Sequence, residues 1–188
     1  NLYGTSEAGL SVLATPEDLA AAPGTIGRPV WGADIALRGD GGTGDDGELW
    51  VRNRASISRG GWIATGDLAH RDAAGRLFVR GRSDDMIVSG GENVGPWELE
   101  AVLAAHGDVA EAVAVGVADR AYGQRLVAFV VPHPGSRIDA GALRGWLAGR
   151  AARHQMPRDL LVRDALPLTA IGKVDRRALR REAAEDAR

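Results

Sequence analysis

One lysine stands out among the basic residues of this sequence. Of 23 Lys and Arg residues all but one are arginines, and the exception is Lys173. It follows Gly172 in the run Pro167–Arg176, where the glycine gives a loop freedom and the lysine carries charge. An ammonium on a flexible stem is a compact, rotatable donor, unlike the planar guanidinium, and it suits a transient contact with phosphate. The sequence therefore favours Lys173 as a catalytic cation, with a solvated surface lysine as the alternative.

A second group of reactive side chains lies at the beginning of the chain, in Tyr3, Gly4, Thr5, Ser6 and Glu7. The aromatic ring could stack on a purine, the two hydroxyls could bind phosphate, and the carboxylate could hold Mg²⁺. The glycine would permit a close approach of the backbone. A turn with polar caps explains the same run, so it points to nucleotide binding only in combination with other motifs.

Two further runs could contact a ligand. Asp67, in the run Thr65–Leu68, is expected just after a strand, where a carboxylate can accept hydrogen bonds from both hydroxyls of a ribose. Its alternative is a turn cap. Gly90-Gly91, inside the run Gly81–Asn93, would let the backbone approach a ligand or swing, and an ordinary loop is the alternative there.

Composition excludes several classes of function. The formal net charge of −2 gives no electrostatic reason to expect nucleic acid as a partner. No apolar run approaches the roughly 18 residues of a membrane helix, so no transmembrane segment is expected. The absence of cysteine excludes disulfides and thiol nucleophiles, and the four histidines form no metal-binding pair. A cytoplasmic location fits this composition, and the oligomeric state stays open.

The first part of the chain is predicted to be rich in β-strands. Short apolar or alternating segments at 34–37, 48–52 and 76–79 are bounded by glycine turns, which is typical of antiparallel strands. Residues 8–32 are expected to be irregular, because prolines and glycines interrupt them repeatedly.

The second part is predicted to be a short sheet flanked by helices, which makes the fold class α+β. Pro96 suits the first position of a helix, Gly107 its C-terminal cap, and Asp139 the N-cap of a second helix. The expected elements are a helix from Pro96, strands at 109–117 and 126–131, a helix at 139–153, a strand at 160–163 and a charged helix at 175–186.

Order and spacing connect the four runs. Together they resemble the later core motifs of the adenylate-forming superfamily of acyl-CoA synthetases, peptide-synthetase adenylation domains and luciferases. The resemblance covers essentially the whole chain. It is most similar to actinobacterial fatty-acyl-CoA synthetases through Tyr3–Gly9, Ala14–Leu19 and Ser89–Val94. The chain begins inside the first motif, so we expect a C-terminal fragment of such an enzyme.

The resemblance implies a division of the chain into three parts. Residues 1–81 would be the β-rich remnant of the large AMP-binding domain and 82–84 a hinge that includes Asp84. Residues 85–188 would form the small, mobile α+β domain. The fragment alone is expected to be inactive, since the phosphate loop and most of the acyl pocket of the large domain are absent.

The implied reaction has two steps. A carboxylic acid attacks the α-phosphate of Mg-ATP to give acyl-AMP, the small domain rotates, and the thiol of CoA attacks the mixed anhydride. Lys173 would bind the adenylation transition state. The residues implied for ligand binding are Tyr3 against adenine, Gly4, Thr5 and Ser6 at phosphate, Glu7 on Mg²⁺, Asp67 and Arg82 on the ribose, and Ser89, Gly90 and Gly91 along the pantetheine of CoA.

Several positions depart from the family pattern. Leu168 replaces a usual Arg, Gly95 a usual aromatic residue, and His154-Gln155 a usual Tyr-Lys, while the stretch between Ile57 and Trp62 is short. These departures bear on CoA binding more than on adenylation. An adenylation domain that loads a carrier protein is therefore one alternative, and a non-catalytic module that binds a nucleotide or a partner is another.

Overall fold

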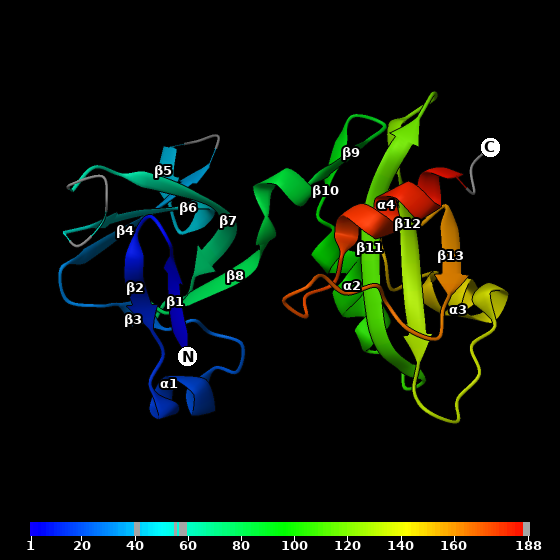
Figure 1. Cartoon of the computed structure of the whole chain (residues 1–188), viewed down its shortest axis with the longest axis horizontal. Helices are drawn as coiled ribbons and strands as arrows, with labels where there is room; N and C mark the ends of the chain where they lie inside the picture. Colours follow the sequence, from blue (N-terminus) through cyan, green and yellow to red (C-terminus); the bar gives the residue numbers. More distant parts are fainter. Residues whose placement is uncertain (40–41, 55, 57–59, 186–188) are drawn as a thin grey trace. The chain divides into compact units, whose positions relative to one another are not determined.

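The computed structural model describes residues 1–39, 42–54, 56 and 60–185, and the chain divides into two compact units, Asn1–Asp84 and Asp85–Arg188 (Figure 1). We call them unit 1 and unit 2. Unit 1 is almost entirely β-structure, whereas unit 2 combines one sheet with helices. The expected α+β class is therefore confirmed. Within the described residues no helix is long and apolar enough to cross a membrane.

Unit 1 contains two antiparallel sheets. The smaller has the order β1-β2-β3 and the larger the order β5-β4-β6-β7-β8. The element bounds are β1 (Leu2–Thr5), β2 (Gly9–Leu13), α1 (Pro16–Ala21), β3 (Arg28–Pro29), β4 (Ala33–Gly39), β5 (Gly42–Gly44), β6 (Asp46–Asn53), β7 (Ile63–Arg71) and β8 (Leu77–Arg82). One cluster of buried side chains joins the sheets, with Val12 from the smaller and Leu37, Leu49, Val51 and Leu77 from the larger.

The expectation that residues 8–32 are irregular is wrong. They contain β2, β3 and the short helix α1, which begins with a capping box. In that box the Thr15 hydroxyl accepts the Asp18 backbone N–H at 3.2 Å, and the Asp18 carboxylate accepts the Thr15 N–H at 3.2 Å. Pro16 occupies the first turn, where a missing N–H costs nothing. The prolines and glycines here start and stop elements instead of preventing them.

Unit 2 is built on a sheet of order β10-β9-β12-β11, with β13 running parallel to β12. The 3₁₀ turn η1 (Ser83–Asp85) leads into it from unit 1. The other bounds are β9 (Ile87–Ser89), β10 (Glu92–Val94), α2 (Pro96–Ala104), β11 (Val109–Asp119), β12 (Gly123–Pro132), α3 (Ala140–Leu147), η2 (Arg153–Gln155), β13 (Asp159–Val162) and α4 (Arg176–Glu185).

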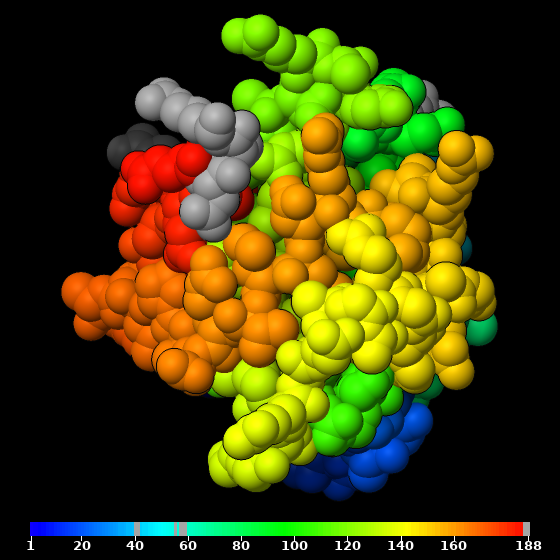
Figure 2. Space-filling model, turned by 90° about the vertical axis from the view of Figure 1, so that its right-hand side faces the viewer, coloured from blue at the N-terminus to red at the C-terminus, as the bar shows by residue number. Residues whose placement is uncertain are grey.

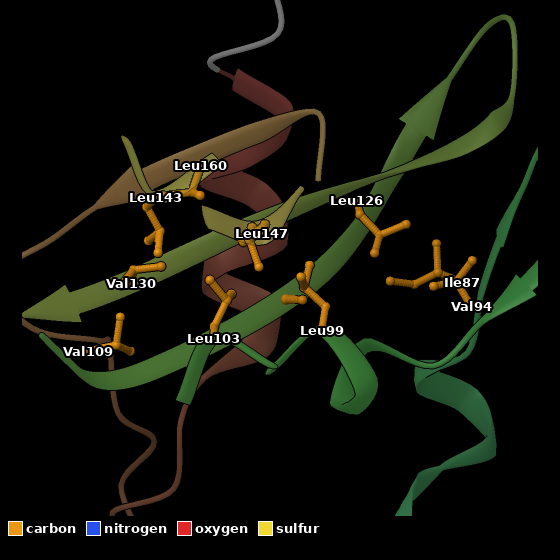
Figure 3. Close-up of a cluster of buried hydrophobic side chains, with 12 residues drawn as sticks. Ile87, Val94, Leu99, Leu103, Val109, Leu126, Val130, Leu143, Leu147 and Leu160 are labelled. Carbon is orange, nitrogen blue, oxygen red and sulfur yellow. The ribbon is translucent and has the colours of Figure 1, made fainter. Parts of the chain in front are cut away.

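Strand β12 is buried on both faces. Successive side chains of a strand point to opposite sides, so Leu126, Ala128 and Val130 enter one cluster while Val127 and Phe129 enter another. Figure 3 shows the first cluster, in which Leu99 and Leu103 of α2 and Leu143 and Leu147 of α3 converge on the sheet. The second cluster contains Leu179 and Ala183, so α4 covers the opposite face.

Two helix ends differ from the sequence-based expectation. Helix α2 is capped at Ala105 instead of Gly107, and α3 stops at Leu147 although its expected N-cap, Asp139, is confirmed. The early end of α3 follows from Ala148, which takes an extended conformation (ψ 122°), and from Gly149 at φ 86°. The last helix was expected to reach Asp186, which lies outside the described residues, as do residues 57–59 of the shortened stretch.

The core of unit 2 yields a stability prediction. Leu99 is fully buried, so Leu99→Ala should lower the free energy of unfolding by about 2–5 kcal/mol through lost burial and the cavity it leaves. The matched control is Leu168→Ala, since Leu168 is 61 % exposed and its truncation should cost less than about 0.5 kcal/mol. Urea unfolding of both variants measures the difference, and equal costs would contradict the packing described here.

Candidate functional sites

The first candidate site is a hollow in unit 1 with a volume of about 550 Å³. It lies where the end of β1 meets β7 and β8. Its lining residues are Gly4, Thr5, Ser6, Glu7, Ile63, Ala64, Thr65 and Arg82. The structure thus brings together, around one cavity, residues from three separate runs of the sequence: Gly4, Thr5, Ser6 and Glu7 from the first, Thr65 from the second and Arg82 from the third.

Tyr3, Asp67 and Arg82 form a hydrogen-bonded group beside this hollow. The Tyr3 hydroxyl donates to Asp67 Oδ2, and Arg82 Nη1 lies 3.4 Å from Asp67 Oδ1. Arg82 Nη1 also donates to the Thr65 carbonyl at 2.8 Å. Asp67 lies inside β7, opposite Arg82 in β8, and not just after a strand as expected. The antiparallel pairing itself therefore places the two residues side by side.

Two glycines make this geometry possible. Gly66 has φ 74°, and a Cβ added there would lie 2.8 Å from Arg82 Nη2, so its missing side chain leaves room for the guanidinium. A Cβ at Gly4 would lie 2.3 Å from the Gly9 carbonyl oxygen. The lack of a side chain at Gly4 is therefore required by the pairing of β1 with β2, a reason that the sequence alone did not provide.

The electrostatics of the group keep Tyr3 protonated. Burial, followed by the hydrogen bond to Asp67, raises the pKa of the Tyr3 phenol well above its usual range. The pKa of Arg82 is also raised, chiefly by its hydrogen bond with Asp84, whose Oδ1 accepts from Arg82 Nε at 3.2 Å. The site therefore presents a neutral phenol and a charged guanidinium on either side of the Asp67 carboxylate.

Glu7 is the residue expected to hold a metal ion. It is exposed at the rim of the hollow. The described residues contain no group of three or more His, Cys, Asp or Glu side chains that could form a protein-only metal site. Mg²⁺ usually binds one or two carboxylates plus water and substrate phosphates. A single exposed carboxylate at the rim of this hollow fits that mode of binding.

The second candidate site is a hollow of about 530 Å³ in unit 2. Its lining residues are Ser89, Gly90, Glu92, Tyr122, Arg125, Leu126, Arg153, His154, Met156 and Arg158. Gly90 donates its backbone N–H to the Tyr122 carbonyl at 2.9 Å, which joins the loop after β9 to the β11–β12 turn. Gly90 and Gly91 have φ values of 62° and 86°, so two successive left-handed residues explain the glycine pair.

Three arginines line this second hollow, and two of them are paired with carboxylates. Arg125, with 9 % of its side chain exposed, pairs with Asp159, and Arg158 Nη1 lies 2.9 Å from Asp119 Oδ2. The Asp119 carboxylate also accepts the backbone N–H groups of Ala121 and Tyr122, which lower its pKa. It therefore shapes the turn that carries Tyr122 while holding Arg158.

Sequence reasoning did not single out Tyr122, Arg153 or Arg158. Tyr122 lies in a turn, Arg153 begins the short 3₁₀ helix η2, and Arg158 directly precedes β13, and none of them belongs to a recognisable motif. The parallel pairing of β13 with β12 brings Arg158 to the hollow. Of the two unusual residues His154 and Gln155, only His154 is among the lining residues. Gln155 Nε2 donates to the Glu98 carboxylate on α2.

Gly95 replaces a usual aromatic residue, and the structure places another ring against it. A Cβ at Gly95 would lie 2.4 Å from the indole ring of Trp97. Trp97 Nε1 is buried and has no hydrogen-bond partner among the described residues. The indole ring of Trp97, two residues further along the chain, therefore lies beside position 95.

Lys173 lies in the segment between β13 and α4, which forms part of the surface of unit 2 (orange in Figure 2). Its side chain is exposed. The loop is closed by a bridge between Leu168 and Val174, and Gly172 at φ 77° makes its tightest turn. The structure thus presents Lys173 on a short closed loop of unit 2.

Neighbouring carboxylates at the boundary between the units belong to different units. Asp84 is hydrogen bonded to Arg82 in unit 1. Asp85 instead pairs with Arg180 of α4, and Arg176 Nε lies 3.9 Å from Asp85 Oδ2, both within unit 2. Asp84 therefore contacts a residue of unit 1, whereas the next residue, Asp85, contacts residues of unit 2.

Comparisons with known proteins identify relatives of this chain. Residues 98–173 match the family model of the AMP-binding enzyme C-terminal domain. The indoleacetate–CoA ligase of Aromatoleum aromaticum is 37 % identical over 191 residues, which cover 92 % of this chain and 38 % of that protein. The long-chain-fatty-acid–CoA ligase of Yersinia pestis is 36 % identical over 200 residues, which cover 96 % and 35 %.

A solved structure agrees with these relatives. ATP-bound MatB from Rhodopseudomonas palustris superimposes with a TM-score of 0.88 at 27 % sequence identity, over 100 % of this chain and 41 % of that protein. The chain thus spans about two fifths of the length of the proteins that it matches. The resemblance noted from the sequence motifs is confirmed at the level of the superfamily.

The raised pKa of Tyr3 can be tested by alkaline titration. In a Tyr122→Phe chain, where Tyr3 is the remaining tyrosine, tyrosinate absorbance should be absent at pH values where an ordinary phenol, with a pKa of about 10, ionises. Because the folded pKa is raised, the protonated phenol stabilises the fold below about pH 10, and this contribution is lost as the pH rises further.

Asp67→Asn is the companion variant. It removes the carboxylate charge but keeps the burial, so the titration of Tyr3 should shift to lower pH. A Tyr3 that titrates like a free phenol in the Tyr122→Phe chain would contradict the geometry.

Proposed function

The chain belongs to the adenylate-forming superfamily through its AMP-binding enzyme C-terminal domain, and on that premise we propose that the intact protein is an AMP-forming acid–CoA ligase. The observation that carries the proposal is the hollow of unit 1. There Gly4, Thr5, Ser6, Glu7 and Arg82, taken from distant parts of the sequence, surround one cavity. The sequence resemblance implies Gly4, Thr5, Ser6 and Arg82 for ATP and Glu7 for its Mg²⁺.

In the proposed first step, a carboxylate oxygen of the acid attacks the α-phosphorus of ATP. The bond from that phosphorus to the oxygen bridging to the β-phosphate breaks, and pyrophosphate leaves. Thr5 and Ser6 would bind phosphate, Tyr3 would lie against adenine, and Asp67 with Arg82 would hold the ribose hydroxyls. Mg²⁺, held by Glu7 and the phosphates, would neutralise part of their charge.

Lys173 would act in this step by placing its ammonium near the α-phosphate as negative charge accumulates there. A preorganised cation at developing charge is worth more in the transition state than in the ground state, which is what accelerates the reaction. The exposed position of Lys173 on a short loop suits a contact that is made for one step and then withdrawn.

In the proposed second step, the sulfur of CoA attacks the acyl carbon, the bond from that carbon to the AMP oxygen breaks, and the thiol proton goes to solvent. The Ser89–Gly91 loop would border the pantetheine chain. The hollow beside it supports CoA as the acceptor, because Arg153 and Arg158 line it and arginine binds phosphate well. A carrier protein stays the alternative acceptor, favoured by Leu168 in place of the usual arginine.

We propose residues 82–84 as the hinge between a remnant of the large domain (1–81) and a small mobile domain (85–188). The change of side-chain partners between Asp84 and Asp85 supports a pivot there. Lys173 is proposed for the first step and the Ser89–Gly91 loop for the second, and both lie on the same small domain. Because both must act at the same acyl group in turn, the small domain has to rotate between the steps. We also propose that the 188-residue chain alone is inactive, because it spans only about two fifths of the length of the proteins that it matches.

For the substrate we propose a fatty acid. The support is the sequence resemblance to fatty-acyl-CoA synthetases together with the similarity to the long-chain-fatty-acid–CoA ligase of Yersinia pestis. An aromatic acid is the alternative, since the indoleacetate–CoA ligase is similarly close. A panel of saturated fatty acids and aromatic carboxylic acids, tested for acid-dependent exchange of pyrophosphate into ATP by the intact protein, decides between them.

Replacing Lys173 should separate the two steps. In the intact protein, Lys173→Ala should lower the rate of acyl-AMP formation by about 100-fold or more, because one preorganised charge at the transition state is lost. Thioester formation from supplied acyl-AMP should stay near the wild-type rate. Lys173→Arg should also be impaired, since its planar fork differs in shape and direction. Equal loss of both steps in Lys173→Ala would contradict the assignment.

The basic hollow of unit 2 predicts how acceptors are distinguished. Arg153→Ala should raise the KM for CoA about tenfold, as expected for one lost charge-assisted hydrogen bond, and should leave the KM for free pantetheine unchanged. Arg137→Ala is the control, because Arg137 is exposed in unit 2 and is not among the residues lining the hollow. If wild type used CoA and pantetheine equally well, the carrier-protein alternative would be preferred.

A further inference from the structure

Thr169 makes several of the hydrogen bonds within the loop that carries Lys173. Thr169 donates its backbone N–H to the Lys173 carbonyl at 2.7 Å, and its hydroxyl accepts the Lys173 backbone N–H at 3.2 Å. Its own carbonyl accepts the Gly172 N–H at 2.9 Å. Both backbone polar groups of Lys173 are therefore bound by the same residue, four positions earlier in the chain.

We propose that Thr169 is a positioning residue for Lys173, and that its hydroxyl fixes the direction in which the ammonium leaves the loop. This inference rests on the proposed function. The lysine ammonium sits at the end of a flexible stem. The region that it can reach is therefore centred on the position of the Lys173 backbone. A displacement of a reacting group by about 1 Å can reduce a rate about 100-fold.

The base of the loop is fixed independently of Thr169. Arg176 Nη1 donates to the Ala114 carbonyl at 2.9 Å, and Arg176 Nη2 donates to Glu100 Oε1 at 2.8 Å. Glu100 Oε1 also accepts the Ala114 N–H at 2.8 Å, so β11, α2 and the start of α4 are joined at one point. The Asp175 N–H donates to the Pro167 carbonyl at 2.8 Å.

These contacts divide the loop into a fixed base and a closed tip. Removing the Thr169 hydroxyl leaves the base and the Leu168–Val174 bridge in place. It releases the Lys173 N–H in an exposed loop, where water can replace the lost partner, so the fold should persist. The effect should therefore appear in the step that uses Lys173 and not in general stability.

Two substitutions of Thr169 separate the effect of its hydroxyl from the effect of its shape. Thr169→Val keeps the size and β-branched shape but removes the hydrogen-bond acceptor, whereas Thr169→Ser keeps the hydroxyl and loses a methyl group. Thr43→Val is the matched control, because Thr43 is an exposed threonine of β5 in unit 1. Each variant is made in the intact protein and assayed with the acid from the panel that gives the fastest wild-type exchange.

Thr169→Val should lower the kcat of acyl-AMP formation between about tenfold and about 100-fold, with the KM for ATP little changed. Thioester formation from the supplied acyl-AMP should stay within about twofold of wild type, and Thr169→Ser should recover most of the first step. Thr43→Val should match wild type in both steps.

The inference is overturned if Thr169→Val adenylates at the wild-type rate, if both steps fall together, or if serine fails to restore the first step. A different result tests the proposed function. If the wild-type protein makes no acyl-AMP from any acid of the panel, the proposed function is wrong, and the positioning role of Thr169 is wrong with it. Normal adenylation by wild type with an unaffected Thr169→Val variant would refute the positioning role alone.

Discussion

The burial of β12 on both faces is the constraint on which the functional arrangement of unit 2 depends. A strand that is apolar on two sides must be covered on two sides, so α2 and α3 pack against Leu126, Ala128 and Val130, and α4 packs against Val127 and Phe129. A shift of one residue in register would exchange the two faces. The same strand begins at the turn that meets the Gly90 loop, while α4 begins just after the lysine loop. Packing therefore fixes both loops of unit 2 to one sheet.

In unit 1, the proposed nucleotide site depends on strand pairing instead of helix packing. Asp67 and Arg82 are opposite one another in β7 and β8, and the missing side chain at Gly66 lets the guanidinium lie across the strand. The Tyr3 hydroxyl completes the group from β1. Because these contacts satisfy one another within the protein, the carboxylate is held in place before a ligand arrives. A nucleotide would then meet an oriented site, which lowers the entropic cost of binding.

Much of the fold followed from local signals in the sequence. The apolar runs of β11 and β12 and the Asp139 cap were predicted because each depends on neighbouring residues. The early end of α3 and the elements within residues 8–32 were missed, since a capping box and the backbone of Ala148 decide them. The candidate site residues were proposed from the order and spacing of their motifs, and several of them line one hollow of unit 1. Tyr122 and Arg158 could not be found in this way, because only the pairing of strands distant in sequence brings them to one hollow.

The two groups of residues are proposed to act in successive steps joined by acyl-AMP. A rapid-quench single turnover of the intact protein with a carboxylic acid, ATP and CoA tests this most directly. Acyl-AMP should rise and then fall as acyl-CoA appears, with AMP and pyrophosphate formed in equal amounts. Release of ADP and phosphate, or acyl-CoA formation that requires no adenylate, would contradict the central claim.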